Sequence, residues 1–194
     1  MSEEIQSRRT TIAVVGDATI APGDPRAETA WALGRGIVDQ GWVLITGGHG
    51  GVMEAAGRGA RESTRWTPGS SVGLLPGHAP DTANPFVDIA IPTGLDVARN
   101  SLVAHADAVV AIGGGAGTLS EMAMAWQLLR LVIALEGPGW AGRLAGEPLD
   151  ARVRYPDIPD DCVRAASDAA EAVSLLQRWL PRYTQAHPGI TRKV

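Results

Sequence analysis

A glycine-rich run from Gly113 to Glu121 (GGGAGTLSE) holds the residues whose types and spacing are best suited to chemistry. Glycines let the backbone come close to a ligand and adopt positive φ. If a helix begins behind them at Thr118, its unpaired N–H groups and its dipole favour an anion such as a phosphate. The candidate ligand-binding residues of this turn are Gly113, Gly114, Gly115, Gly117 and Thr118.

A second glycine turn lies upstream, in TGGHGG at residues 46–51. An apolar strand at 43–46 is expected before it and a helix from about Val52 after it. This turn adds Gly47, Gly48, Gly50 and Gly51 to the candidate ligand-binding residues. Two such turns in a chain of 194 residues predict one anionic ligand held between two loops.

Three charged residues near these turns have both a chemical and a structural interpretation. Glu121 can be a catalytic carboxylate, or it can close a capping box with Thr118. Arg99 carries a planar guanidinium that suits phosphate, although an arginine on a helix surface can equally be solvated. Asp17, which follows Gly16 at the end of the first expected strand, can contact a nucleotide sugar or base, or be a turn residue. Gly16 and Asp17 are both candidate ligand-binding residues.

Composition excludes several classes of function. Sixteen of the 17 Lys and Arg residues are arginines, and the single lysine is Lys193. A pyridoxal-phosphate enzyme needs a lysine for its Schiff base, and a Walker A loop needs one for its phosphates. A lysine next to the C-terminus is a poor candidate for either role, so both classes are excluded, a pyridoxal-phosphate-dependent decarboxylase among them. The net charge of -4 argues against nucleic acid and anionic membranes as partners. No set of histidines, cysteines and carboxylates has metal-ligand spacing. His49 and His78 lie in glycine- or proline-flanked loops, where each can face a ligand or be a plain loop histidine, and the second is favoured.

Length and cysteine content predict one cytoplasmic domain. A chain of 194 residues can bury a core as a single domain, 1–194, with segments 1–10 and 182–194 expected to be flexible. The single cysteine, Cys162, favours a reducing compartment. The sequence has neither the apolar core of a signal peptide nor a run of ~18 apolar residues that would span a membrane.

The elements that must position these residues alternate between strand and helix. The pattern predicts strands at 11–15, 43–46, 71–75, 87–91, 108–112, 131–135 and 163–166. It predicts helices at about 25–40, 52–62, 95–105, from 118, and at 169–180 with Asp168 as cap, and an irregular stretch at 137–161. The expected fold is therefore α/β and Rossmann-like, a doubly wound and mostly parallel sheet with helices on both faces. Ligands in such folds lie beyond the carboxyl ends of the strands, where both glycine turns fall.

Three segments together resemble the Lonely Guy (LOG) superfamily, often labelled lysine-decarboxylase-like: TGGHGGVMEAA at 46–56, the arginine at 99 and GGGAGTLSE at 113–121. The resemblance runs from about Thr11 to Leu180. It is closest to a bacterial branch of nucleotide-binding Rossmann proteins that includes molybdenum cofactor carrier proteins. It implies a homo-oligomer, a dimer or a tetramer, that binds a small phosphorylated ligand.

In the hydrolytic members of that superfamily, the motif PGGxGTxxE supplies phosphate-binding glycines and a catalytic glutamate, and an arginine followed by lysine precedes it. Glu121 matches the glutamate and Arg99 the arginine, whereas Gly113 replaces the proline and Asn100 the lysine. The other matching positions are Gly114, Gly115, Gly117 and Thr118.

The resemblance implies two main functions. The first is hydrolysis of the N-glycosidic bond of a nucleoside 5'-monophosphate, with Arg99 and Glu121 as catalytic residues and without a required cofactor or metal. The second is non-catalytic carriage of a phosphorylated cofactor such as the molybdenum cofactor. A nucleotide sensor that uses the same loops is a third interpretation.

Overall fold

The computed structural model describes residues 8–185 and residue 187. Seven strands form one sheet in the order β4-β3-β2-β1-β5-β6-β7, and neighbouring strands pair in parallel throughout. The strands are β1 (Thr11–Gly16), β2 (Val43–Thr46), β3 (Ser71–Leu75), β4 (Ile89–Pro92), β5 (Ala108–Ile112), β6 (Leu131–Leu135) and β7 (Arg164–Ala166). All residues of β5 and β6 are buried, which fits their unbroken apolar sequences AVVAI and LVIAL.

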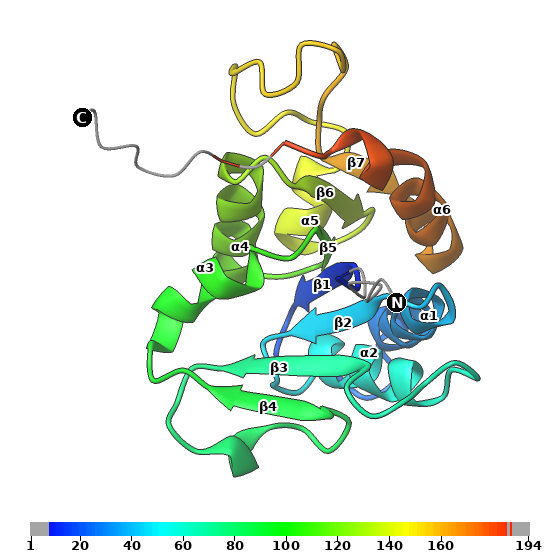
Figure 1. Ribbon diagram of the computed structural model, residues 1–194, viewed down its shortest axis with the longest axis vertical. Coiled ribbons are helices and arrows are strands. Elements are labelled where there is room, and N and C mark those ends of the chain that lie inside the picture. The colour runs from blue at the N-terminus through cyan, green and yellow to red at the C-terminus, as the bar shows by residue number, and fades with distance from the viewer. Residues whose placement is uncertain (1–7, 186, 188–194) are drawn as a thin grey trace, which may run out of the picture.

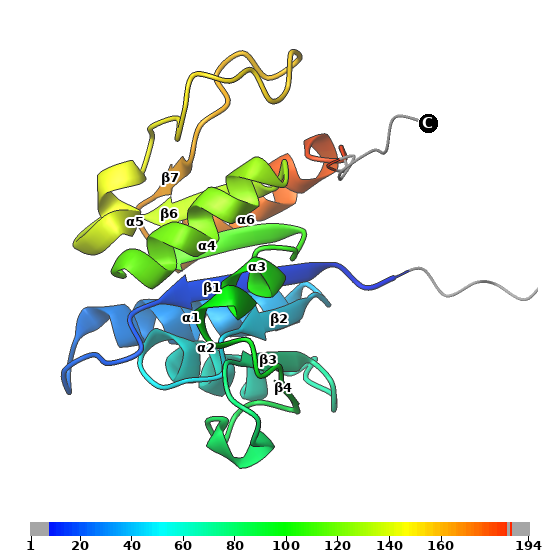
Figure 2. The ribbon, with the colours of Figure 1, turned by 90° about the vertical axis from the view of Figure 1, so that its left-hand side faces the viewer.

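Helices cover both faces of the sheet. They are α1 (Pro25–Asp39), α2 (Val52–Arg61), α3 (Asn100–Val103), α4 (Ala116–Gln127), α5 (Gly139–Leu144) and α6 (Ala169–Trp179). Residues of α1, α2 and α6 share one apolar core with one face of the sheet, and residues of α3, α4 and α5 share a second core with the other face. Figures 1 and 2 show this three-layer arrangement, with α3 and α4 nearest the viewer in Figure 2. The predicted α/β, Rossmann-like fold is confirmed.

The strand order reverses beside β1. The chain runs outward from β1 through β2 and β3 to β4, returns to pair β5 with the other side of β1, and continues to β6 and β7. The two strands are in register, with Gly16 opposite Ile112 at their carboxyl ends. In sheets of this kind, the ends of the two strands at the reversal open a crevice in which ligands bind.

Four elements differ from the sequence-based expectation by more than one residue. Strand β4 begins two residues later than predicted, at Ile89. The predicted helix at 95–105 is a 3₁₀ turn, Asp96–Arg99, followed by the short α3. Helix α4 begins at Ala116 and not at Thr118, because Gly115 takes the N-cap position and needs no capping side chain there. The stretch 137–161, expected to be irregular, contains α5.

Other local predictions are confirmed. Pro25 occupies the first turn of α1, and the carboxylate of Asp168 accepts a hydrogen bond from the Glu171 N–H at the start of α6, 2.8 Å away. Of the terminal segments expected to be flexible, residues 1–7, 186 and 188–194 lie outside the described residues. Within the described part, Tyr183 is buried and its hydroxyl donates a hydrogen bond to Asp161. No helix among the described residues is long and apolar enough to cross a membrane.

Candidate functional site

A pocket of about 240 Å³ lies at the carboxyl ends of β1 and β5, where the strand order reverses. Larger hollows of about 690 and 560 Å³ also occur on the surface. We assign the site to the smaller pocket because it alone of the three is lined by a buried ion pair. Its lining residues are Gly16, Asp17, Ala18, His49, Met53, Arg99, Asn100, Gly115, Gly117, Thr118 and Glu121.

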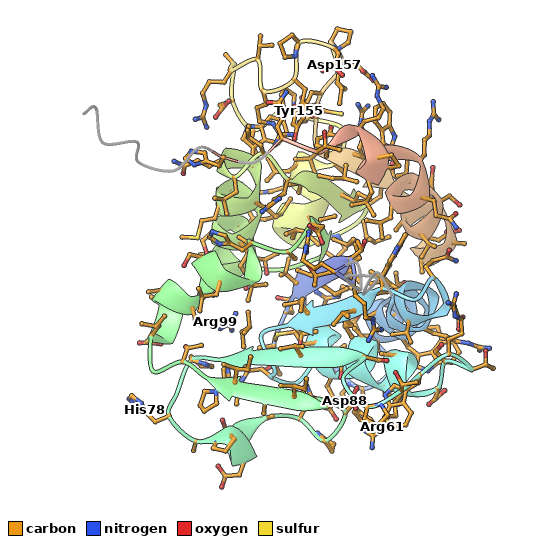
Figure 3. All side chains as sticks on the ribbon, viewed as in Figure 1. Arg61, His78, Asp88, Arg99, Tyr155 and Asp157 are labelled. Atoms are coloured by element: carbon orange, nitrogen blue, oxygen red, sulfur yellow. The ribbon has the colours of Figure 1, made fainter. Side chains whose placement is uncertain are left out.

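The ion pair joins Arg99 to Glu121. Arg99 Nη1 donates to Glu121 Oε1 at 2.9 Å, and the two side chains are only 10% and 9% exposed. Arg99 comes from the turn directly before α3 and lies between α3 and the strand ends (Figure 3). It is therefore not the solvated surface arginine that the sequence also allowed. The capping box is also wrong, because the Glu121 carboxylate binds Arg99 and Gly115 caps the helix without a side chain.

Burial sets the protonation of this pair. Desolvation raises the pKa of Glu121 from 4.5 to about 7, although the nearby Arg99 lowers it. His49, across the pocket, has a lowered pKa because of burial and the positive charge of Arg99. Near neutral pH the pocket thus holds a carboxyl group that can give or take a proton beside a permanent cation.

The turn between β5 and α4 divides into an anchored half and an open half. Gly113 and Gly114 are buried and have positive φ, and a side chain on Gly114 would overlap Thr118. Gly115 and Gly117 are exposed at the helix start, and no atom lies within 4 Å of where a side chain on Gly115 would project. The first N–H groups of a helix lack intrahelical partners, so this open half offers free donors to an anion in the pocket.

The turn between β2 and α2 supports the pocket more than it lines it. A Cβ on Gly47 would come within 2.5 Å of Arg99 Nη2, so this glycine makes room for the guanidinium. Gly48 packs against Leu75, and the backbone of Gly51 lies directly against the carbonyl of Asp17. From this side of the site, the pocket is lined by His49 and by Met53 of α2.

Most predicted site residues are brought together, but they do not all reach the pocket. Those that line it are Gly16, Asp17, Arg99, Gly115, Gly117, Thr118 and Glu121. Gly47, Gly48, Gly113 and Gly114 do not line it, and Gly50 and Gly51 line the hollow of about 560 Å³ instead. Their roles toward a ligand stay predictions. Among the described residues, no group of three or more histidines, cysteines and carboxylates could hold a metal ion.

Sequence reasoning did not select four lining residues: Ala18, His49, Met53 and Asn100. Asn100 was noted only as the replacement for a lysine, yet it is 8% exposed and its Nδ2 donates to Ser120 Oγ at 2.8 Å. Its place beside Arg99 in the sequence was the available signal, since Arg99 was already a candidate. His49 and Met53 lie in the segment 46–56 that carries the family resemblance, and this was the available signal for both. Ala18 belongs to no motif, and only the fold places it at the pocket.

A Rossmann-like sheet with a glycine-rich helix start at its strand reversal and a buried arginine–glutamate pair beside it defines the class of this protein. The chain belongs to the SLOG cluster4 family, whose model matches residues 9–168.

Its relatives include proteins with and without a named activity. An uncharacterized protein of Archaeoglobus fulgidus is 41% identical over 123 residues, which are 61% of this chain and 78% of that protein. The cytokinin riboside 5'-monophosphate phosphoribohydrolase of Mycobacterium marinum is 31% identical over 123 residues, 61% of this chain and 63% of the enzyme. The match to that enzyme thus covers less than two thirds of its length.

Similar solved structures cover nearly the whole chain. The molybdenum cofactor binding protein of Rippkaea orientalis has a TM-score of 0.72 and 32% identity, covering 88% of this chain and 97% of that one. The molybdenum cofactor carrier protein of Chlamydomonas reinhardtii has a TM-score of 0.72 and 32% identity, covering 90% of this chain and 99% of that one.

Proposed function

We propose that this protein binds a nucleoside 5'-monophosphate and hydrolyses its N-glycosidic bond, releasing the base and ribose 5-phosphate. One observation carries the proposal: the Arg99–Glu121 pair and the open half of the β5–α4 turn line the same pocket. An anion-binding helix start and a carboxyl group with a pKa of about 7 are the two parts that this reaction needs.

The phosphate would be held by the turn. The N–H groups that follow Gly115 have no partners within the helix and lie at the positive end of the α4 dipole. Arg99 Nε is buried and has no hydrogen-bond acceptor within the described part of the chain. Because buried donors are normally satisfied, such a group is expected to gain a partner when a ligand binds.

The chemistry would use both members of the ion pair. In its ionised form, Glu121 stabilises positive charge at the anomeric carbon and orients a water molecule toward it. The water oxygen forms the new bond to that carbon as the glycosidic C–N bond breaks and its electron pair leaves with the base. The water gives up one proton and the base gains one, and Glu121 is placed to relay it because its pKa lies near neutrality. Arg99 keeps the carboxylate oriented.

A second candidate function is carriage of the molybdenum cofactor. It is favoured by coverage, because the similarity to the carriers spans 97% and 99% of their chains whereas the match to the phosphoribohydrolase spans 63% of the enzyme. In this case the turn would hold the phosphate of the pterin, and Glu121 and Arg99 would contact the cargo without cleaving a bond. Asn100 and Gly113, which replace two residues of the hydrolytic motif, fit this alternative.

We also propose that the protein is a cytoplasmic homo-oligomer, a dimer or tetramer, that needs no cofactor for hydrolysis. Large apolar side chains are exposed along β4 and around α3, and a second copy could cover them: Ile89, Ile91, Leu95, Val97 and Leu102. Sedimentation of the purified protein, compared with that of Val97→Asp, would measure this association; an unchanged monomer in both would contradict it.

Incubation with AMP separates the two functions. The hydrolase predicts free adenine, released faster by the wild type than by Glu121→Ala. Equal rates from the two proteins would overturn the hydrolase. The carrier instead predicts molybdenum and a fluorescent oxidised pterin in protein purified from cells that make the cofactor, and their loss in Gly115→Val. Protein purified without either would overturn the carrier.

A further inference from the structure

The carboxylate of Asp17 is used by the protein itself. One oxygen, Oδ2, accepts a hydrogen bond from the Gly114 N–H at 2.8 Å and also pairs with Arg26 Nη1. Gly114 is 97 residues further along the chain, so this contact ties the end of β1 to the turn after β5. Arg26 does not line the pocket, and its other nitrogens bind Asp24 at the start of α1.

The backbone of Asp17 makes a second connection. Its carbonyl accepts the N–H of Val52, the first residue of α2, at 3.0 Å. A Cβ on Gly51 would overlap this carbonyl, and a Cβ on Gly113 would come within 2.7 Å of Asp17 Oδ2. The glycines of both turns are therefore required where the chain passes close to Asp17.

We propose that Asp17 is a positioning residue that sets the orientation of the anion-binding turn, and that it does not itself contact the ligand. The inference rests on the proposed phosphate site. The Asp17 carboxylate accepts a hydrogen bond from the Gly114 N–H and so fixes the anchored half of the turn. The N–H groups after Gly115 are then held facing the open pocket. Preorganised donors bind an anion without the cost of ordering the loop.

Arg26 neutralises the charge of Asp17 in this arrangement. A carboxylate beside a phosphate site would repel the ligand, and Arg26 offsets its charge through the ion pair with Asp17. The two side chains are 25% and 31% exposed, so solvent screens this pair in part. Removing Arg26 should therefore weaken binding of an anion even though Arg26 lies outside the pocket.

The test uses two probes, inorganic phosphate and AMP, with amide exchange measured by NMR. The variants are Asp17→Ala, Asp17→Asn and Arg26→Met, with Asp150→Ala as control because Asp150 forms a similar carboxylate–arginine pair in an exposed loop. Because a single oxygen of Asp17 makes both contacts, the Asn oxygen can replace it. We expect Asp17→Ala to bind both probes about tenfold more weakly, which is the effect of one lost hydrogen bond. The Gly114 amide of this variant should also exchange faster.

Asp17→Asn should bind within about threefold of the wild type or more tightly, since it keeps the acceptor and loses the negative charge. Arg26→Met should bind more weakly and Asp150→Ala should be unchanged. Equal weakening by Asn and Ala would show that binding depends on the charge of Asp17 and not on its acceptor for the Gly114 N–H, and would overturn the inference, as would unchanged Gly114 exchange in Asp17→Ala. If the wild type binds neither probe, the proposed function fails, whereas faster Gly114 exchange would still support the positioning role. If Asp17→Ala does not fold, Asp17→Asn and Arg26→Met decide the question.

Discussion

Arg99 and Glu121 lie 22 residues apart in the chain, yet their side chains form an ion pair of 2.9 Å that is almost fully buried beneath the pocket. Arg99 is held by the turn before α3 and Glu121 by the second turn of α4, so the pair also joins these two elements. A buried charge is tolerated only while its partner is present. Protonation and substitution at this pair should therefore change stability and binding together.

The first prediction concerns pH. The pKa of Glu121 is 4.5 when exposed and about 7 in the folded protein, so between these values the folded state holds a proton that the unfolded state releases. The free energy of unfolding should therefore fall as pH rises through this window, by up to about 3 kcal/mol, and then stay constant. Urea denaturation at pH 5 and pH 8 would measure the fall.

The control is Glu121→Gln, which cannot titrate. The difference in unfolding free energy between the wild type and this variant isolates Glu121 from the other carboxylates. Asp24 and Asp107, whose pKa values are lowered, act in the opposite direction and at more acidic pH. A difference that does not change between pH 5 and pH 8 would show that Glu121 has an ordinary pKa.

The second prediction concerns the open half of the β5–α4 turn. Gly115→Val should abolish binding of AMP while leaving the unfolding free energy within about 1 kcal/mol of the wild type, because its side chain would project into space free of protein atoms. Gly77→Val is a matched control, since Gly77 also has free space around it and lies away from the pocket. The affinity for AMP would be measured by calorimetry. Equal affinity of the two variants would show that the phosphate does not bind at this turn.

The third prediction concerns Gly47, which lies under the guanidinium of Arg99. Gly47→Ala should displace Arg99, since the new Cβ would come within 2.5 Å of Nη2 and 2.8 Å of Cζ. The displaced arginine would leave Glu121 without its cation and push the pKa of Glu121 higher still. The pH midpoint of the difference measured for the first prediction should then shift upward. A midpoint equal to that of the wild type would mean that Arg99 adjusts without leaving Glu121.

The fourth prediction concerns the segment between α5 and β7, which extends beyond the sheet (Figure 2). Arg154 anchors it: the guanidinium pairs with Asp161, donates to the carbonyls of Trp126 and Arg130, and lies 3.4 Å from the centre of the Trp126 ring. Arg154→Leu should lower the unfolding free energy by about 3–5 kcal/mol, because it leaves a buried carboxylate unpaired.

Arg152→Leu provides the contrast for this measurement. Like Arg154, Arg152 pairs with a carboxylate, here that of Asp150. The Arg152 side chain, however, is 63% exposed. Its removal should leave the unfolding free energy nearly unchanged, because solvent screens an exposed pair. Similar losses in the two variants, measured by urea denaturation, would mean that Arg154 contributes little more than an exposed pair.

Much of this fold follows from local sequence. Unbroken apolar runs such as 108–112 and 131–135 predict buried parallel strands, and glycines directly after two strands predict where a ligand would lie. Arg99 and Glu121 were found from their types and their place in the motif. Asp168 was found as a cap because capping depends only on the next three residues.

What the sequence did not reveal are contacts between distant residues. Asp17 reaches Gly114 across 97 positions, and Arg99 reaches Glu121 from a 3₁₀ turn that stands where a regular helix was expected. The start of α4 was misplaced because Gly117 was taken as part of the turn. Glycine in a helix costs about 1 kcal/mol relative to alanine, so Gly117 does not prevent the helix from beginning before it.

The last prediction tests which of the two functions the pocket serves. Asn100 lines the pocket, is 8% exposed, and donates to Ser120 Oγ at 2.8 Å, where the hydrolytic motif has lysine. Asn100→Lys adds a cation beside the phosphate site and should tighten AMP binding several-fold at low salt, an effect that weakens as salt is added. If loss of that lysine limits hydrolysis, adenine release should rise in the same variant. Asn100→Met is the control, since it also loses the contact with Ser120 but carries no charge. Tighter binding without faster release would favour the carrier, whereas identical binding by the two variants would place the phosphate away from position 100.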